Sequence, residues 1–593
     1  MRGNAGGTRE SRPHDALGAL RYIQKGAPLA RPHMDTNPQH NSGSAQAKRP
    51  ILERITPRRP RLRVEDVNVV DRPMFRRAIG GTVVGNLMEW YDVGVYGYLA
   101  VIIGKLFMPD TVDPAIQTLF SLGVFAVTFV ARPLGGIVLG QLGDRVGRQK
   151  ILVFTLLMMA LATFGIGVLP DYSVWGVAAP IMLVVLKLVQ GFSTGGEYAG
   201  ATTFITEYAP DRRRGFYAAL LDLGSYLGFA VGAAFVSVLQ LTLSEDAMEG
   251  FAWRIPFLVA LPLGIIALWF RSKIEDTPAF KEAQASAEAA GADAARDADA
   301  PKGIKDLVRS YWRELLTAFV LVAAANTASY ALTSYMPTYL SEALHYDPVH
   351  GNLLTLPILV LVALTIPLAG LLSDRLGRRR VMFSAAISAL VLAVPAFLLM
   401  MHGQIWSTLL GLLLLAVPVV LYVGIQSSSL PAIFPTTSRY GGMGISYNLA
   451  VAIFGGFAPF IMQALVTFTG SALAPAFWVI GTSVAGLVAV FFLKETARRP
   501  LPGSLPSVAS DEEAEELVAT QEENPDLDMA ELFEQVPSLR DVETEVDAKI
   551  AAAGGLSTVA DGEGDPAVNP EASGPDAAPT GEAAPGEAPT ARA

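Results

Sequence analysis

The sequence predicts an all-α membrane protein with twelve transmembrane helices in two parallel six-helix halves. The 593 residues are 51% hydrophobic and only 17% charged, whereas about a quarter of the residues of an average soluble protein are charged. From about residue 76, apolar blocks of roughly 20 residues recur, the length that crosses a hydrocarbon core about 30 Å thick. A loop motif also occurs twice, 230 residues apart. These three observations predict the fold.

Each apolar block is predicted to be one membrane-spanning helix, and twelve such blocks follow one another. An even number of spans places both termini on the same side of the membrane. The predicted spans lie near residues 77–105, 116–141, 150–170, 176–202, 215–241, 253–271, 313–341, 351–373, 380–401, 405–430, 441–468 and 473–493.

Positive charge is concentrated in the loops after the even-numbered blocks, which predicts that both termini are cytoplasmic. The opposite loops carry little beyond Lys105 and Arg254. The part of the chain before residue 501 is basic, although the formal net charge of the whole chain is -10. The reason is that residues 501–593 hold 22 Asp and Glu against three basic residues. The basic loops contain Arg145, Arg148, Lys150, Arg212, Arg213, Arg214, Arg375, Arg378, Arg379, Arg380, Arg439 and a charged stretch over 271–313.

The repeated motif defines the two halves. GQLGDRVGR at 140–148 recurs as GLLSDRLGR at 370–378, each time after the second span of a half. Both copies face the same side, which indicates parallel repeats, a transporter design in which substrate binds between the halves near the midplane. The predicted segments are a basic disordered leader over 1–75, the first half over 76–272, a linker over 273–312, the second half over 313–494 and an acidic, mostly disordered tail over 495–593.

Several motifs resemble one family of membrane transporters. The paired G-x-x-x-D-R-x-G-R loops look like the signature of the major facilitator superfamily. The strings GNLMEWYDVGVYG at 85–97, QGFSTGGEYAGA at 190–201 and SYMPTYL at 334–340 narrow the resemblance to its metabolite:proton symporter branch, most closely to osmosensory proline and glycine-betaine transporters. The resemblance implies a multi-pass protein of a prokaryotic inner membrane.

The resemblance also implies the function. The expected activity is proton-coupled import of proline, glycine betaine or a related zwitterion by alternating access, stimulated by osmotic upshift. Relatives with similar motifs carry small carboxylates such as citrate, oxoglutarate or shikimate, so a carboxylate symporter is the alternative, and a membrane solute sensor is a second one. In this family the repeated loop acts as a conformational latch, a role that falls on Asp144, Arg145, Arg148, Asp374, Arg375 and Arg378.

Polar stripes in the apolar spans predict the substrate and proton pathway, because ionised side chains inside a membrane are costly and usually functional. In the first span four polar residues fall within an arc of about 120°, and in the fourth span five fall within about 100°. Buried ion pairs or helix-helix hydrogen bonds are the alternative role for each charged residue. The candidates are Asn86, Glu89, Asp92, Tyr96, Arg132, Lys187, Gln190, Glu197, Tyr198, Asp222, Asn326 and Tyr330.

Aromatic residues near these stripes are candidate walls for a quaternary ammonium ligand, since cations bind the faces of aromatic rings. Tyr96 and Tyr330 share helix faces with Glu89 and Asn326 and are the preferred candidates. A dicarboxylate would require several fixed cations instead, and only Lys187 and Arg132 qualify.

The composition excludes other classes of site. The chain has no cysteine and six histidines, so no Cys-based metal site or thiol nucleophile can form, and no metal-ligand spacing or nucleotide-binding loop is present. We expect no enzyme activity, no cofactor other than the coupling proton, and no nucleic-acid partner. The Arg-rich leader can contact anionic lipid, Met34 is an alternative start to Met1, and no segment specifies an oligomeric state.

Overall fold

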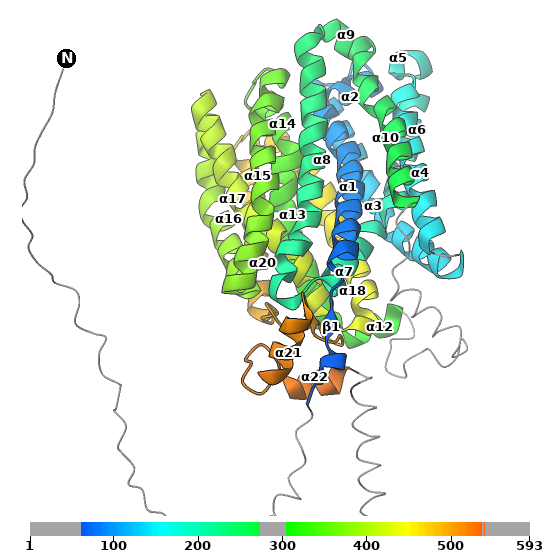
Figure 1. Ribbon diagram of the computed structural model, residues 1–593. Coiled ribbons are helices and arrows are strands. Elements are labelled where there is room, and N and C mark those ends of the chain that lie inside the picture. The colour runs from blue at the N-terminus through cyan, green and yellow to red at the C-terminus, as the bar shows by residue number, and fades with distance from the viewer. Residues whose placement is uncertain (1–60, 147, 273–303, 537–538, 540–593) are drawn as a thin grey trace, which may run out of the picture. The chain divides into compact units, whose positions relative to one another are not determined.

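The computed structural model describes residues 61–146, 148–272, 304–536 and 539. Within this part the chain is almost entirely helical, and long helices lie side by side in a bundle (Figure 1). Strand β1 and helices α21 and α22 lie at one end of the bundle, called here the loop end, and α9 lies at the opposite end.

The first half runs from α1 to α10. Its helices are α1 (Arg72–Tyr98), α2 (Ala100–Phe107), α3 (Pro114–Val146), α4 (Arg148–Val168), α5 (Tyr172–Trp175), α6 (Ala178–Thr194), α7 (Glu197–Tyr208), α8 (Arg214–Thr242), α9 (Glu245–Gly250) and α10 (Ile255–Ser272), with 3-10 turns η3 (Asp211–Arg213) and η4 (Ala252–Arg254).

The second half runs from α13 to α20, preceded by the short helix α12 (Ile304–Ser310). Its elements are α13 (Trp312–Tyr330), η5 (Ala331–Tyr335), α14 (Met336–Thr338), η6 (Tyr339–Ala343), α15 (Pro348–Leu376), α16 (Arg378–Met401), α17 (Ile405–Ser429), η7 (Pro431–Ile433), α18 (Thr436–Ala450), η8 (Val451–Gly456), α19 (Ala458–Thr469) and α20 (Ala474–Phe492).

Each predicted span is occupied by one helix or by consecutive helical segments. Among the described residues nine helices are long and apolar enough to cross a membrane, and Val153–Val168 and Ala252–Ile266 are shorter apolar helices. The first span, α1, carries the predicted Glu89 and Asp92 within its 27 residues. The predicted class, a helical membrane protein, is confirmed.

Some spans are interrupted where the sequence predicted one continuous helix. The fourth predicted span is divided into α6 and α7 at Gly195 and Gly196. The seventh and eleventh spans contain π-helical turns, η5, η6 and η8. Such wide turns often occur at functional sites, and η5 and η8 both adjoin the interface between the halves.

The two halves pack along several helix pairs. Helix α8 lies against α15 and α17 of the second half as well as against α1 of its own half, and α3 lies against η8, α18 and α19. The core between the halves is therefore formed mainly by α1, α3 and α8 on one side and by η5, α15, α17, α18, η8 and α19 on the other.

The terminal segments differ from the prediction in part. Residues 61–75 were expected to be disordered, but α1 begins at Arg72, with Asp71 as its N-cap, and is preceded by η2 (Val64–Asp66) and β1 (Asn68–Val69). The described part of the acidic tail contains β2 (Ser507–Val508), α21 (Asp511–Ala519) and α22 (Met529–Gln535). Hydrophobic side chains of the two segments pack against one another. This burial of apolar surface stabilises segments that their composition predicted to be disordered.

The predicted orientation of the helices can be tested because the chain has no native cysteine. Glu512 is exposed at the loop end and Glu245 is exposed at the opposite end. With cytoplasmic termini, an impermeant thiol reagent added to intact cells should label Glu245→Cys and should label Glu512→Cys only after the cells are opened. Labelling of Glu512→Cys in intact cells would reverse the orientation.

Candidate functional site

Close packing of α3 against α6 brings the charged residues of the first half together. A Cβ atom at Gly191 would lie 1.7 Å from the carbonyl oxygen of Thr128, and one at Gly195 would lie 2.0 Å from that of Arg132. Small residues four positions apart allow membrane helices to approach closely. Gly191 and Gly195 of the 190–201 motif are therefore required for the contact between these two helices.

Glu89 and Arg132 form a buried ion pair between α1 and α3. A guanidinium nitrogen of Arg132 lies 3.0 Å from Oε1 of Glu89, and both side chains are 1% exposed. The guanidinium also lies over the ring of Phe129, 4.7 Å from its centroid, and 5.6 Å from that of Trp90. The sequence left open whether Glu89 has a fixed partner, and the structure identifies Arg132 as that partner.

A second buried polar chain joins α1, α4 and α6. Thr163 donates to Asp92 at 2.8 Å, Gln190 donates to Thr163 at 2.9 Å, and Lys187 donates to Gln190 at 2.9 Å. The ammonium group of Lys187 also lies 3.9 Å from the ring centroid of Tyr96. Lys187 is thus held by Gln190 and Tyr96, both in the first half.

A cavity lies between the two halves, next to these polar clusters. The space between atoms there is about 360 Å³, part of it open to solvent. Its walls are mainly aromatic, with amide and hydroxyl groups and one carboxylate among them. The residues that line it are Trp90, Tyr198, Asp222, Ser225, Tyr226, Phe229, Ala325, Asn326, Ser329, Tyr330, Val423, Gln426 and Tyr447.

Asp222 is the carboxylate of this cavity and contacts both halves. Its Oδ1 accepts a hydrogen bond from the Tyr198 hydroxyl at 3.0 Å, and its Oδ2 accepts one from Ser427 of α17. The Tyr198 ring stacks on that of Tyr447, with centroids 4.3 Å apart and planes 10° apart. Asp222 is 4% exposed. Because it bonds to residues of both halves, a change in its contacts affects both halves at once.

The other predicted pathway residues surround this arrangement. Asn86 donates to Ser225 and to the carbonyl of Leu221, which ties α1 to α8. Asn326 donates to Gln426 at 3.5 Å within the second half. The ring of Tyr330 extends toward the first half and packs against Trp90 and Phe129. Glu197 begins α7 and is half-buried, outside the cavity lining.

Several cavity residues were not among the sequence candidates. Tyr226 and Ser329, which bond to each other across the halves at 2.6 Å, lie on helices from which other candidates had been chosen. Gln426 and Ser427 begin a polar run, QSSS at 426–429, in an otherwise apolar span. From that polar run, Gln426 and Ser427 could have been predicted to lie inside the protein. By contrast, nothing in the sequence distinguishes Tyr447 from the tyrosines of membrane interfaces.

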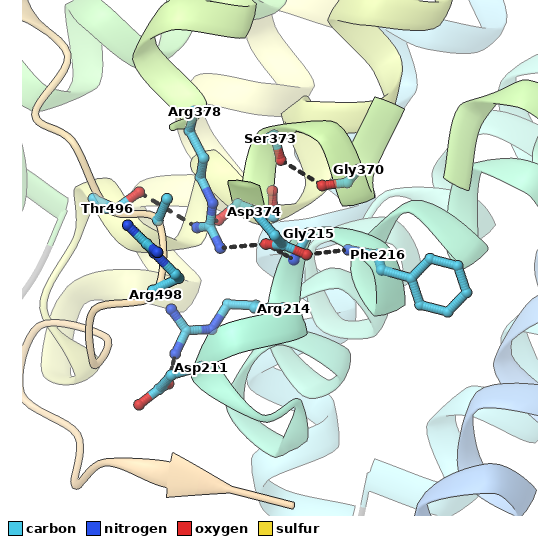
Figure 2. A network of polar contacts seen from close by, with 12 residues as sticks. Asp211, Arg214, Gly215, Phe216, Gly370, Ser373, Asp374, Arg378, Thr496 and Arg498 are labelled. Carbon is cyan, nitrogen blue, oxygen red and sulfur yellow. Dashed lines mark hydrogen bonds and ion pairs between the residues drawn. The ribbon is translucent and has the colours of Figure 1, made fainter. Parts of the chain in front are cut away.

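A separate network joins the halves at the loop end, and Figure 2 shows it. The carboxylate of Asp374, at the end of α15, accepts the backbone N–H groups of Gly215 and Phe216 at 2.8 and 2.9 Å. These groups lie in the first turn of α8, where backbone donors lack partners within the helix and the dipole favours an anion. The second copy of the repeated loop therefore binds directly to the first half.

The arginines of this copy differ in their contacts. Arg378 is fully buried, lies 3.9 Å from Asp374 and donates to the carbonyl of Ser428 at 2.6 Å. Arg375 is exposed. For the first copy, the structure describes the helix backbone at Asp144, Arg145 and Arg148 but not their side chains. The latch role predicted for both copies thus has a described geometry only at Asp374 and Arg378.

Comparison with known proteins identifies the family. The family model described as sugar (and other) transporter matches residues 80–503. The chain belongs to this transporter family. It is 49% identical to the ectoine/proline transporter ProP of Corynebacterium glutamicum over 80% of this chain and 94% of that protein. It is 41% identical to the proline/betaine transporter of Escherichia coli K12 over 80% of this chain and 95% of that protein.

The fold of the transporter is also similar to that of solved structures. The proton:xylose symporter XylE, of the major facilitator superfamily, matches with a TM-score of 0.60 and 16% identity, covering 72% of this chain and 98% of XylE. A partially occluded, inward-open form of XylE from Escherichia coli matches with a TM-score of 0.57. The protein is therefore a multi-pass membrane transporter and not an enzyme.

The Glu89–Arg132 pair predicts a specific pattern of stabilities in the transporter. Removing one member of a buried ion pair leaves an uncompensated charge, at a cost of about 3–5 kcal/mol. Glu89→Gln and Arg132→Gln should each lower the melting temperature of the purified protein, and the double variant should recover part of the loss. Losses that simply add in the double variant would show that the two side chains are not coupled.

Proposed function

We propose that this transporter imports small zwitterionic compatible solutes, such as proline and glycine betaine, together with protons, by alternating access. The cavity between the halves is the observation that supports this proposal most directly. It lies at the interface of two repeats, where transporters of this design bind substrate, and its walls combine aromatic rings with a single carboxylate.

The chemistry of the cavity suits a cation that also carries a carboxylate. Trp90, Tyr198, Tyr330 and Tyr447 present ring surfaces, and a cation over such a ring gains roughly 0.5–2 kcal/mol. Asp222 supplies the opposite charge. The substrate carboxylate can accept hydrogen bonds from donors in the same lining, Ser225, Asn326, Ser329 and Gln426.

The same lining argues against the carboxylate alternative. A small dicarboxylate or tricarboxylate brings two or three negative charges into a water-poor site, which is costly without fixed cations. Among the described residues that line the cavity there is no lysine or arginine. Arg132 and Lys187 are instead engaged with Glu89 and with Gln190 and Tyr96. The names of the relatives, ectoine, proline and betaine transporters, point the same way.

Proton coupling is proposed to involve the buried charges of the first half. Glu89 lies beside Trp90 and is held by Arg132, and that guanidinium also contacts the Trp90 ring that lines the cavity. Protonation of Glu89 would weaken the ion pair and so alter the position of Arg132 against the Trp90 ring, which lines the cavity. Asp92 and Lys187 form the second buried pathway, linked by Thr163 and Gln190.

The orientation and regulation belong to the same proposal. From the positive-inside rule and the arginine-rich loops of the loop end, we propose that this end and both termini are cytoplasmic. We propose that osmotic upshift stimulates transport and that the basic leader contacts anionic lipid. A solute sensor is the weaker alternative, because two parallel halves around a shared cavity are the architecture of translocation.

Uptake by a host that lacks its own carriers tests the function. Labelled glycine betaine or proline should accumulate, uptake should rise after an osmotic upshift, and a protonophore should abolish accumulation. Glu89→Gln should prevent accumulation but retain exchange of internal for external solute, which also shows that the variant is folded. Uptake of citrate alone, indifferent to osmolality, would replace this proposal by the carboxylate alternative. Binding without uptake would favour the sensor.

Tyr330 provides a matched pair of variants for the aromatic wall. Its hydroxyl makes no hydrogen bond to another described residue, while its ring packs against Trp90, Phe125 and Phe129. Tyr330→Phe should leave the apparent affinity for glycine betaine nearly unchanged. Tyr330→Leu should weaken it by roughly 2- to 30-fold, the loss of one cation-π contact. Equal affinities in the two variants would remove Tyr330 from the substrate site.

A further inference from the structure

The segment that follows the last membrane helix crosses the loop end and bonds to both halves. Residues 495–509, called here the strap, connect α20 to the small helices of the tail. The polar contacts of the strap are mostly made by its backbone, which means that its path, rather than a particular side chain, is held in place.

On the second half, the strap is fixed at two points. Glu495 accepts the backbone N–H groups of Arg378 and Arg379 at 2.9 and 3.2 Å, at the start of α16. Further along, the carbonyl of Pro502 accepts Nη2 of Arg439 at 2.8 Å and the N–H of Thr436 at 3.1 Å. The hydroxyl of Ser504 also bonds to that of Thr436, at 3.0 Å.

On the first half, the strap is fixed by a second set of contacts. The carbonyl of Arg499 accepts Nη1 of Arg214 at 3.0 Å, and the N–H of Ser507 donates to Oδ2 of Asp211 at 3.0 Å. Arg214 follows Pro210 by four residues and Arg439 follows Pro435 by four residues, so the two arginines occupy similar places in the two halves. Each is buried and bonds to a strap carbonyl, so the strap occupies equivalent positions on the two halves.

Strand pairing with the segment before α1 strengthens the attachment to the first half. Strand β2 pairs in parallel with β1, with Asn68 opposite Ser507 and Val69 opposite Val508. Asn68 donates to the carbonyl of Pro506 at 2.8 Å, and Val70 donates to that of Val508 at 3.0 Å. Since β1 is followed directly by α1, the strap is joined to the first membrane helix.

The tail helices hold this strand pair in place. Leu62 packs with Leu532, Phe533, Val536 and Leu539, and its backbone exchanges hydrogen bonds with the side chain of Gln521. Val67 packs with Val508 and Ala514 of α21. The strap is therefore bounded by a small folded unit built from both terminal segments.

We propose that the strap is a clamp that restrains the loop end from opening. Ser504 is bonded to the second half and Ser507 to the first, and three residues of extended chain span at most about 10 Å. The halves can therefore separate at this end only if one set of contacts is released. The strap adds to the Asp374 contact a restraint that the tail helices stabilise, and its release sets how often the loop end opens. The clamp does not depend on which solute is carried. It rests only on the part of the proposed function in which the halves move relative to each other.

A buried reporter cysteine measures this restraint without any substrate. Ser373 is fully buried at the contact between α8 and α15, and Ser373→Cys would be the only thiol in the chain. The rate of labelling by a small maleimide in lipid vesicles reports opening of the loop end. Termination after Leu505 removes β2 and the tail helices. It should raise the labelling rate by roughly threefold, because the population with an open loop end rises by the same factor.

The matched control is termination after Leu539, which keeps the strap and the described tail. Its labelling rate should equal that of the full chain. Equal rates in all three proteins would overturn the proposal, as would an increase of the same size in the control.

A disulfide lock tests the clamp in the full-length chain, in case the shortened protein does not fold. Asn68 and Ser507 are partners in the strand register, a geometry whose Cα separation suits a disulfide. With Asn68→Cys and Ser507→Cys oxidised, labelling of Ser373→Cys, quantified on its own peptide by mass spectrometry, should slow several-fold and recover on reduction. The single variant Asn68→Cys should not respond to oxidant. An oxidised pair that leaves the labelling rate unchanged would overturn the proposal.

Discussion

The structure depends on the high cost of leaving a charged side chain unpaired inside a hydrocarbon layer. The first half avoids this cost with Glu89 paired to Arg132, and with Asp92 joined to Lys187 through Thr163 and Gln190. These pairs remain within one half. Asp222 differs, because one of its hydrogen-bond donors, Ser427, belongs to the other half. In the proposed mechanism, substrate therefore replaces a protein partner at Asp222 while the remaining charges keep theirs.

Contacts between the halves occur at separate levels along the bundle. Asp374 binds the first turn of α8 at the loop end, Asp222 and Tyr226 bond across the middle, and Asn352 bonds to Gln240 toward the opposite end at 2.8 Å. All of these are hydrogen bonds with short reach, so a rotation of one half against the other breaks one level while another can persist. That division is what alternating access requires of an interface.

The sequence predicted the parts of this structure that depend on hydrophobic length and on repeats. The apolar blocks, the second copy of the repeated loop, and the polar residues of the first and fourth spans correspond to described features. Pairings could not be predicted, because which helices meet is decided by close contacts such as that of Gly191 with Thr128. That Tyr447 and Gln426 line the cavity could not be predicted for the same reason.

The described tail shows a different limit of sequence reasoning. Leu532, Val536 and Leu539 lie near heptad spacing, but the pattern is too short to predict a coiled coil. Their partner is Leu62, more than 450 residues earlier in the chain. A local pattern cannot reveal a contact of that sequence separation, and the acidic composition of the tail masked its few buried apolar positions.

Alternating movement of the halves is the central claim, and paired distance measurements test it most directly. Spin labels would be placed at Arg213 and Arg380 near the loop end, and in a second protein at Ser244 and His350 near the opposite end, all exposed positions. Addition of glycine betaine and a proton gradient should change the two distance distributions in opposite directions, one end opening as the other closes. Distributions that stay fixed, or that widen together, would contradict the account.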